Sequence, residues 1–336
     1  MHMADALVSP PVATGMAVAS LAVGAYSIFR IKKENKPENI PVMGVMGAFV
    51  FATQMVNFTI PGTGSSGHLC GGLLLSALIG PYGGFLSMMA ILLLQCLLFA
   101  DGGLMAYGCN VWNMAFYACF FGYFCIYKPI LSKNPSKKKI LIASILGSVL
   151  SLQLGAFSVT LETLISGVTE LPFLTFLSFM QPIHLAIGFV EGLITSAVLI
   201  FVYNTRPEML NINEKSNEFS FKKVIAILGI VTVLIGGGIS LLASSSPDGL
   251  EWSMENVAGS TELDSKGSAY DKASEIQEKT AILPDYSISN SNNEILGTSF
   301  SGILGSVLVA VILIGGSLIF RFYKKGAKNE QTRKSA

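Results

Sequence analysis

Nitrogen donors at and near the start of the chain are the residues of this sequence best suited to metal chemistry. Met1 offers an α-amine, and His2 offers its backbone nitrogen and its imidazole, so these nitrogens can form fused five- and six-membered chelate rings in one plane. A fourth nitrogen from His68 would complete a square, which favours Ni(II) or Cu(II), whereas Zn(II) prefers a tetrahedron. The glycine-rich run 61–67 would let the backbone turn the His68 imidazole toward the terminus. The alternative, a solvated His2 and a His68 that caps its own loop, stays open at this point.

His184 and Glu191 form a second pair of candidates. They lie seven residues apart in an apolar segment, on one face of a helix and about 10 Å apart along its axis. Ionisable residues inside a membrane segment are functional candidates by default. Three roles are open for them: direct metal ligation, support of the ligands from behind, and structural pairing.

These candidates lie in a chain that is mostly apolar. Of its 336 residues, 51% are apolar and 13% are charged, against about 25% charged residues in a soluble domain, and the mean hydropathy is +0.59. This composition predicts a polytopic helical membrane protein and excludes a soluble enzyme. The net charge of +1 leaves no basic excess for phosphates, which excludes a nucleic-acid binder. The sequence also lacks a GxxxxGKS/T loop and the patterns of serine hydrolases and zinc proteases, so we expect no enzyme activity.

Nine apolar segments are expected to form helices: 11–29, 41–58, 69–80, 82–100, 109–127, 140–161, 175–203, 223–243 and 300–322. Four stretches, 30–40, 128–139, 206–223 and the tail from 321, hold all of the 22 Lys and Arg residues except Lys266, Lys272 and Lys279. By the positive-inside rule, all four lie in the cytoplasm only if the short segment 69–80 also crosses the membrane. The N-terminus and all three histidines are then outside, and the C-terminus is cytoplasmic.

The stretch 244–299 carries ten acidic residues and three lysines and has few large apolar residues. It is expected to form a flexible acidic loop outside the membrane, either a simple linker or a segment that concentrates cations near a binding site. The five cysteines lie in or beside apolar segments without a CxxC pair, so we expect buried thiols and no disulfide framework. No basic residue precedes the first apolar run, unlike in a signal peptide, so we expect Met1 to stay on the protein.

Several motifs in combination resemble the CbiM/NikM family. They are Met1-His2 with Asp5, Ser9-Pro10-Pro11, Gly62-Thr63 through Gly67-His68-Leu69, Leu98 through Leu104, Asn110-Val111-Trp112-Asn113-Met114, His184 through Glu191-Gly192, and Arg206-Pro207-Glu208. Pro247-Asp248-Gly249-Leu250-Glu251 resembles the signature of the small CbiN/NikN subunit. The resemblance implies an all-α polytopic membrane protein of two fused modules. These are a seven-helix metal-binding module at 1–210, a cytoplasmic linker at 211–222, and a two-helix module at 223–336 with the acidic extracytoplasmic loop 244–299.

Members of this family are substrate-binding (S) components of energy-coupling factor (ECF) transporters for cobalt and nickel. The resemblance therefore implies that Met1, His2 and His68 capture Ni²⁺ or Co²⁺ as the transported substrate, and planar nitrogen ligation favours nickel. Supporting or transport roles are expected for the remaining candidates: Asp5, Asp101, Asn110, His184 and Glu191. The implied partners are a transmembrane coupling (T) subunit and cytoplasmic ABC ATPases, so this chain would sit in the plasma membrane and bind no ATP itself.

The chain departs from the family pattern at two places. It has Ala6 and Leu7 where the family often has an aromatic residue and a glycine, and it has an additional serine in the run Gly62-Thr63-Gly64-Ser65-Ser66-Gly67, which bears on the position of His68. Two other classes also follow from the residues. One is a proton-coupled secondary metal transporter with Glu191 and Asp101 as relay groups. The other is a membrane metalloenzyme that uses His68 and His184.

Overall fold

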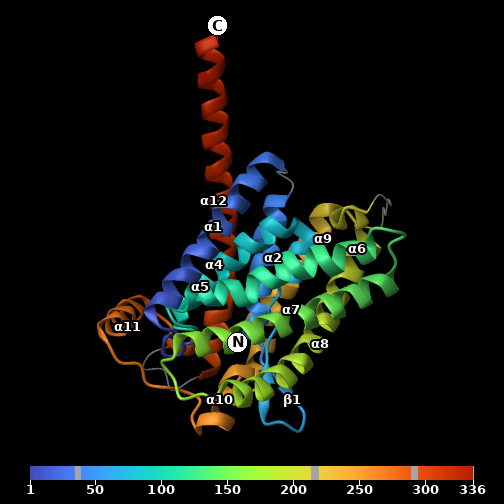
Figure 1. Cartoon of the computed structure of the whole chain (residues 1–336). Helices are drawn as coiled ribbons and strands as arrows, with labels where there is room; N and C mark the ends of the chain where they lie inside the picture. Colours follow the sequence, from blue (N-terminus) through green and yellow to red (C-terminus); the bar gives the residue numbers. More distant parts are fainter. Residues whose placement is uncertain (35–38, 213–218, 289–293, 336) are drawn as a thin grey trace.

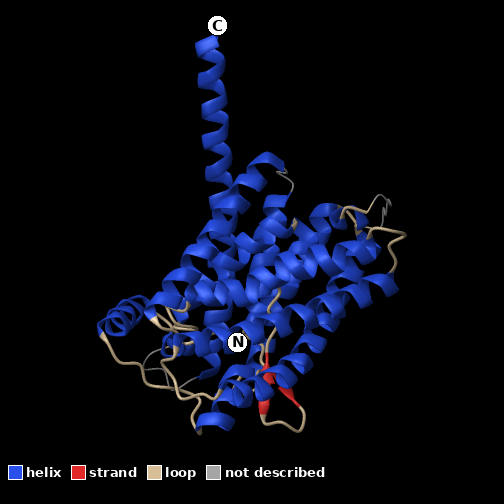
Figure 2. Ribbon diagram, in the orientation of Figure 1, coloured by secondary structure: helices blue, strands red, loops and turns tan. Residues whose placement is uncertain are grey.

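The computed structural model describes residues 1–34, 39–212, 219–288 and 294–335. Within these ranges the chain is built almost entirely of helices, with one two-stranded hairpin (Figure 1, Figure 2). This confirms the expected all-α polytopic membrane protein. Lys36, Lys215 and residues 213–218 of the expected linker, which entered the topology argument, lie outside the described residues, as do residues 289–293 of the acidic loop.

All nine expected apolar segments contain helices. Six described helices are long and apolar enough to cross a membrane: α1 (Pro10–Glu34), α4 (Pro81–Phe99), the continuous run of α5 (Tyr107–Asn110), the π-helix η2 (Val111–Tyr127) and α6 (Lys128–Leu131), α7 (Lys137–Ser166), α8 (Phe173–Thr205) and α12 (Glu294–Ser335). The other three are shorter: α2 (Asn39–Gln54) has 16 residues, α9 (Phe221–Gly237) has 17 and α3 (Gly72–Ile79) has 8. Short 3-10 turns are η1 (Asp5–Leu7), η3 (Pro207–Leu210) and η4 (Ile239–Leu242).

The short helix α3 nevertheless lies in a segment that joins the two ends of the bundle. Its eight residues span only about 12 Å, against a hydrocarbon core of about 30 Å. The next helix, α4, begins beside the C-terminal part of α1, where the Arg30 guanidinium lies 4.7 Å from the centre of the Tyr82 ring. α4 ends before Asp101, which pairs with His2, and His2 stacks on His68. The chain from His68 to Tyr82 therefore runs from one end of the bundle to the other, as the expected topology requires.

Small residues let the long helices approach closely. Gly188 and Gly192 on α8 lie against the backbone of α7, where added methyl groups would collide. Gly44 and Gly47 on α2 leave room for side chains of α12 that pack against them. The C-terminal helix pair (α9 and α12) packs in this way on the N-terminal bundle (residues 1–210). All five cysteines are free, as expected, and four are buried; the expectation of a buried thiol is wrong for Cys125, which is exposed.

Residues 244–288 form most of the acidic stretch and are here called the cap segment. They are folded. They contain α10 (Gly249–Ala258), α11 (Ser268–Thr280) and the turn η5 (Pro284–Tyr286). The cap segment lies at the end of the N-terminal bundle that holds Met1, beside the hairpin of β1 (Phe58–Ile60) and β2 (Ser65–Gly67) (Figure 1). The expectation of a flexible loop is therefore wrong for these residues.

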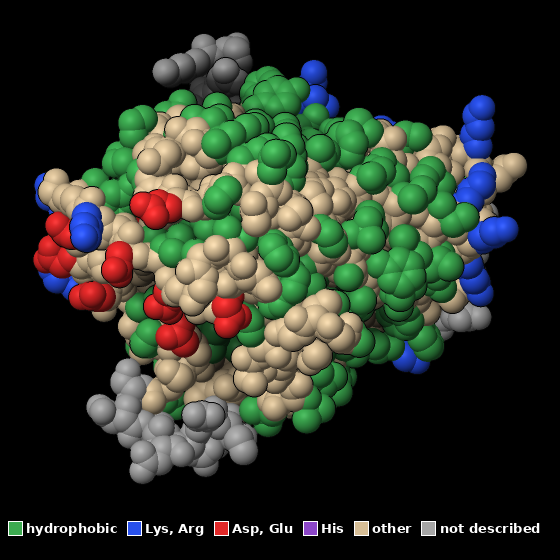
Figure 3. Space-filling view, turned by 60° about the horizontal axis from the view of Figure 1, so that its bottom comes forward, with side chains coloured by type: hydrophobic (Ala, Val, Ile, Leu, Met, Phe, Trp, Pro, Cys, Tyr) green, Lys and Arg blue, Asp and Glu red, His purple; other side chains and the backbone are tan. Residues whose placement is uncertain are grey.

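Charged side chains separate toward the two ends of the molecule. In the space-filling view of Figure 3, Asp and Glu gather at one end and most of the visible Lys and Arg at the other, with a wide hydrophobic belt between them. Exposed leucine, isoleucine and phenylalanine side chains of the long helices make up this belt. Such a belt suits the hydrocarbon core of a bilayer.

Candidate metal centre

The chain start is threaded into the end of the N-terminal bundle. Met1 and Met3 are buried, Met3 completely. The Asn110 side-chain amide pairs with both backbone polar groups of Met3. Its Oδ1 accepts a hydrogen bond from the Met3 nitrogen at 2.7 Å, and its Nδ2 donates one to the Met3 oxygen at 3.1 Å. Asp5 Oδ1 accepts a hydrogen bond from the Ala106 nitrogen at 2.9 Å. Two of the predicted supporting residues thus fix the path of the terminus.

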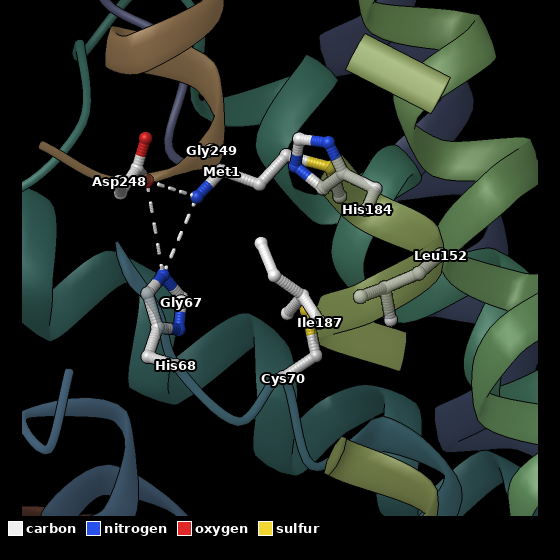
Figure 4. A pocket seen from close by; sticks show the side chains of 9 residues that line it. All are labelled: Met1, Gly67, His68, Cys70, Leu152, His184, Ile187, Asp248 and Gly249. Carbon is white, nitrogen blue, oxygen red and sulfur yellow. Dashed lines mark hydrogen bonds and ion pairs between the residues drawn. The ribbon is translucent and has the colours of Figure 1, made fainter. Parts of the chain in front are cut away.

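Met1 and His68 bring two nitrogens together (Figure 4). The α-amine of Met1 lies 3.3 Å from His68 Nε2, and both residues are buried. His68 Nδ1 is 3.2 Å from the carbonyl oxygen of Leu69, which can only accept, so Nδ1 carries the proton and Nε2 keeps a lone pair. Two nitrogens bound at right angles to one ion, each at about 2.0 Å, would be about 2.8 Å apart. A small shift would therefore let both atoms bind a common ion.

His2 stacks on His68, with ring centres 5.3 Å apart and 21° between the ring planes. Its Nδ1 faces Asp101, 3.1 Å from Oδ1, whereas its buried Nε2 has no hydrogen-bond partner among the described residues. The six-membered chelate ring expected from the sequence needs Nδ1 to face the ion. A half-turn about the Cβ–Cγ bond would exchange Nδ1 with Cδ2, so the expected ligand set requires this rotation.

Asp248, which the site prediction did not include, completes the cluster. Its Oδ2 forms an ion pair with the Met1 amine and lies 4.0 Å from His68 Nε2. Its Oδ1 accepts hydrogen bonds from the backbone nitrogens of Leu250 at 2.8 Å and Glu251 at 3.0 Å, and the Glu251 side chain closes the capping box of α10. One carboxylate oxygen is therefore held by the helix start while the other faces the amine.

The chain before α10 is held against the hairpin that carries His68. The Ser66 nitrogen donates a hydrogen bond to the Pro247 oxygen at 2.8 Å, and Ser66 forms an isolated parallel bridge with Asp248. Trp252 Nε1 donates to the Thr63 oxygen at 2.9 Å. Asp248 followed three residues later by Glu251 is a sequence pattern of a helix start. The sequence carries no signal for the long-range contacts with the hairpin.

The electrostatics of the cluster favour a charged pair beside a neutral histidine. Burial opposes ionisation of Asp248, but the Met1 ammonium and then His68 outweigh burial and hold the pKa of the Asp248 carboxyl below its usual range. Burial lowers the pKa of the Met1 amine and Asp248 raises it, with a net increase. Burial, followed by the Met1 ammonium and His2, lowers the pKa of His68 to about 3. A neutral imidazole is the form that binds metals.

His184 borders the same cluster from α8. Its Nδ1 donates to the Met180 carbonyl at 2.8 Å, which leaves the buried Nε2 with a lone pair and no partner among the described residues. With Met1, His68 and Asp248 it lines a cavity of about 10 Å³, room for one ion or water molecule (Figure 4).

Glu191 supports the loop that follows His68. Its carboxylate is fully buried and accepts hydrogen bonds from the backbone nitrogens of Cys70 and Gly71, each at 3.1 Å. His184 and Glu191 lie on the same helix, but their hydrogen-bond partners differ. The Glu191 side chain binds backbone nitrogens of the loop that follows His68, whereas His184 binds the Met180 oxygen.

The predicted candidates thus fall into two groups. The side chains of one group gather around the terminus, and they are Met1, His2, His68, Asp101 and His184. Asp5, Asn110 and Glu191 bind backbone atoms instead. Among the residues that the structure describes, no three His, Cys, Asp or Glu side chains could hold a metal ion by themselves.

Both parts of the chain match known protein families. The family profile described as the cobalt uptake substrate-specific transmembrane region, CbiM, matches residues 2–209, and the profile of the PDGLE domain matches residues 222–322. Relatives that carry the names of fused nickel transport proteins include NikMN of Archaeoglobus fulgidus, which is 32% identical over 93% of this chain and 96% of its own length. LarMN of Lactiplantibacillus plantarum is 31% identical over 76% of this chain and 79% of its own.

A solved structure is also similar. The crystal structure of a truncated transition metal transporter superposes with a TM-score of 0.53 at 29% identity, and the match covers 60% of this chain and 98% of that one. The family matches confirm the resemblance drawn from the motifs. The chain therefore belongs to the CbiM family of metal transport proteins, as a multi-pass membrane protein that also carries a PDGLE domain.

Proposed function

We propose that this protein is the substrate-binding subunit of an ECF-type importer and that it captures Ni²⁺, or Co²⁺, with the Met1 amine, His2 and His68. The observation that carries the proposal is the buried amine 3.3 Å from His68 Nε2, beside the stacked ring of His2. Once the amine loses its proton, these groups offer nitrogen donors, which suit Ni²⁺ and Co²⁺ better than Mg²⁺ or Ca²⁺. Planar nitrogen ligation supports nickel as the first substrate.

The proposal divides the chain at the boundaries expected from the sequence. Residues 1–210 bind the metal, 211–222 form a cytoplasmic linker, and 223–336 form the module that carries the cap segment. The N-terminus and the cap segment face the outside and the C-terminus faces the cytoplasm. The concentration of Lys and Arg at the end opposite the acidic cap supports this orientation.

Transport requires partners under this proposal. The sequence contains no GxxxxGKS/T loop for ATP. Cytoplasmic ATPases, acting through a transmembrane coupling subunit, would supply the energy. Their ATP hydrolysis would drive a reorientation that withdraws the terminus from the cluster and releases the metal inward.

Metal content tests the ligand set. The purified chain is compared with a variant that carries one alanine before Met1 and with a control that carries one alanine after the last residue. We expect one equivalent of nickel or cobalt in the unextended chain and in the control, and its loss in the N-terminally extended variant, because the extension displaces the free amine. Equal metal in all three proteins would overturn the assignment of Met1.

Uptake of radioactive nickel into vesicles tests the energy source. The chain is reconstituted with its coupling subunit and ATPases, and the catalytic glutamate of the ATPases is replaced by glutamine. We expect uptake to stop. Uptake that continues without ATP but ends when the proton gradient is collapsed would instead identify the proton-coupled secondary transporter.

A further inference from the structure

The cap segment reaches His2 through a chain of two side chains. His2 Nδ1 lies 3.1 Å from Asp101 Oδ1. The other carboxylate oxygen, Asp101 Oδ2, accepts a hydrogen bond from the Tyr286 hydroxyl at 2.5 Å. Tyr286 belongs to η5, at the end of the cap segment farthest in sequence from Asp248. The PDGLE part of the chain therefore meets the candidate centre at two points: at the amine and behind His2.

Tyr286 is itself held in place. Its ring stacks on Phe99, with ring centres 4.6 Å apart and 19° between the planes. Gln95 Nε2 donates to its hydroxyl oxygen at 3.3 Å, and Ser301 Oγ donates to its carbonyl oxygen at 2.9 Å. Burial and then the Asp101 carboxylate raise the pKa of the Tyr286 hydroxyl well above its usual value, so the group stays a donor. The hydroxyl can therefore fix the orientation of Asp101.

A carboxylate behind a histidine ring is a common way to orient a metal ligand, because it binds the ring nitrogen that the metal does not use. In the structure Asp101 faces Nδ1 of His2, the nitrogen that the chelate would need. After the half-turn that the chelate requires, Nε2 would occupy the place of Cε1, which adjoins the place that Nδ1 leaves. Asp101 would then still lie on the side of the ring that carries the N–H group.

We propose that Tyr286 is a positioning residue for the metal ligand His2 and that it acts through Asp101. This inference rests on the proposed function, since it needs His2 to bind metal. It makes the PDGLE part of the chain a contributor to the metal centre: the second module sets the orientation of a ligand supplied by the first.

The test begins with Tyr286→Phe in the full-length chain, which removes the hydroxyl and keeps the ring that stacks on Phe99. Affinity for Ni²⁺ and for Co²⁺ is measured by competition with a coloured chelator, and the visible spectrum of bound Ni²⁺ is recorded. Losing the direct outer partner of a ligating histidine, here Asp101, costs about 10- to 100-fold in affinity; Tyr286→Phe leaves Asp101 in place but unheld, so we expect a loss of up to, and no more than, that of Asp101→Asn. A shifted spectrum is expected as well, because the ligand geometry changes.

A double-mutant cycle separates a positioning role from a merely structural one. If Tyr286 acts through Asp101, adding Tyr286→Phe to Asp101→Asn should cause little further loss, because the two residues are coupled. Tyr270→Phe is the matched control: it removes another cap hydroxyl, which donates to the Val8 oxygen at 3.0 Å and does not contact His2 or Asp101. The control should keep its metal affinity and its spectrum.

Three results would overturn the proposal. Tyr286→Phe could bind metal as the wild type does; both tyrosine variants could lose the same affinity; or the losses in the double mutant could simply add. Each of these would leave the proposed function standing. Failure of the wild-type chain to bind either metal would overturn the proposed function and this inference together.

Discussion

Replacing Glu191 with glutamine should weaken metal binding, although Glu191 touches none of the proposed ligands. Its two carboxyl oxygens accept backbone hydrogen bonds from Cys70 and Gly71, each at 3.1 Å. An amide keeps one acceptor and turns an NH₂ group toward the other N–H, so one buried donor is left unsatisfied. That loss costs about 1–3 kcal/mol, which corresponds to a factor of about 5 to 150 in an equilibrium constant. Because the loop can relieve the conflict by moving His68, nickel affinity should fall by up to this factor.

Isothermal titration of the detergent-purified protein with Ni²⁺ measures the effect, and Glu162→Gln provides a matched control. Glu162 is also a buried glutamate, but its carboxylate accepts from the Asn113 side chain at 2.7 Å, and an amide oxygen can still accept that bond. The control should bind nickel as the wild type does. Unchanged affinity in Glu191→Gln would refute the idea that its backbone contacts position His68. Equal losses in both variants would refute it too, since any buried carboxylate would then have the same effect.

Metal affinity should rise with pH and keep rising past about pH 8, because the Met1 amine must lose its proton to bind; burial lowers the pKa of this amine, but Asp248 raises it more, so the pKa lies above its usual value. In Asp248→Asn that pKa falls, so nickel titrations at each pH should give a profile shifted to lower pH; an unmoved profile would contradict the coupling. A Cβ at Gly249 would lie 2.9 Å from Ile187 Cδ1 and 3.0 Å from His184 Cε1. Overpacking costs about 1–3 kcal/mol and alanine gains about 1 kcal/mol over glycine in a helix, so Gly249→Ala should lower the free energy of unfolding by up to about 2 kcal/mol, and a higher thermal midpoint would disagree. Of the five free thiols only Cys125 is exposed; a membrane-permeant maleimide should label one thiol in the folded protein and five after denaturation, and fewer than five would reveal a disulfide.

The helices could be predicted because each one is an uninterrupted apolar run, but hydropathy does not say where a helix begins. The segment 69–80 shows this. Its helix starts only at Gly72, because the nitrogens of Cys70 and Gly71 bind Glu191 and Gly71 adopts a φ of +84°. An apolar pattern records that residues avoid water and carries no information on such a backbone contact.

The candidate site was predictable where chemistry alone selects the residues. Met1, His2 and His68 stand out because nitrogen donors suit a transition metal, and the structure places the Met1 amine beside His68 Nε2 and the His2 ring on the His68 ring. Asp248 and Tyr286 could not be found in this way, since their role depends on contacts across more than half of the chain. The cap segment looks flexible in sequence because it has few apolar residues of its own. It is ordered by resting on the bundle.

The way the cap segment is attached has a kinetic consequence. It is tethered on both sides by helices, α9 and α12, that pack on α2. Individual contacts of the cap, such as the bond from Gln277 Nε2 to the Gly102 oxygen at 2.7 Å, contribute only about 1 kcal/mol each. A tether of this kind holds the cap segment near the bundle at an effective concentration on the order of millimolar, so modest contacts suffice to keep the cap on the bundle. Detachment and return of the cap are then first-order events whose rates do not depend on how much protein the membrane contains, and a cap supplied as a separate polypeptide would lose that advantage.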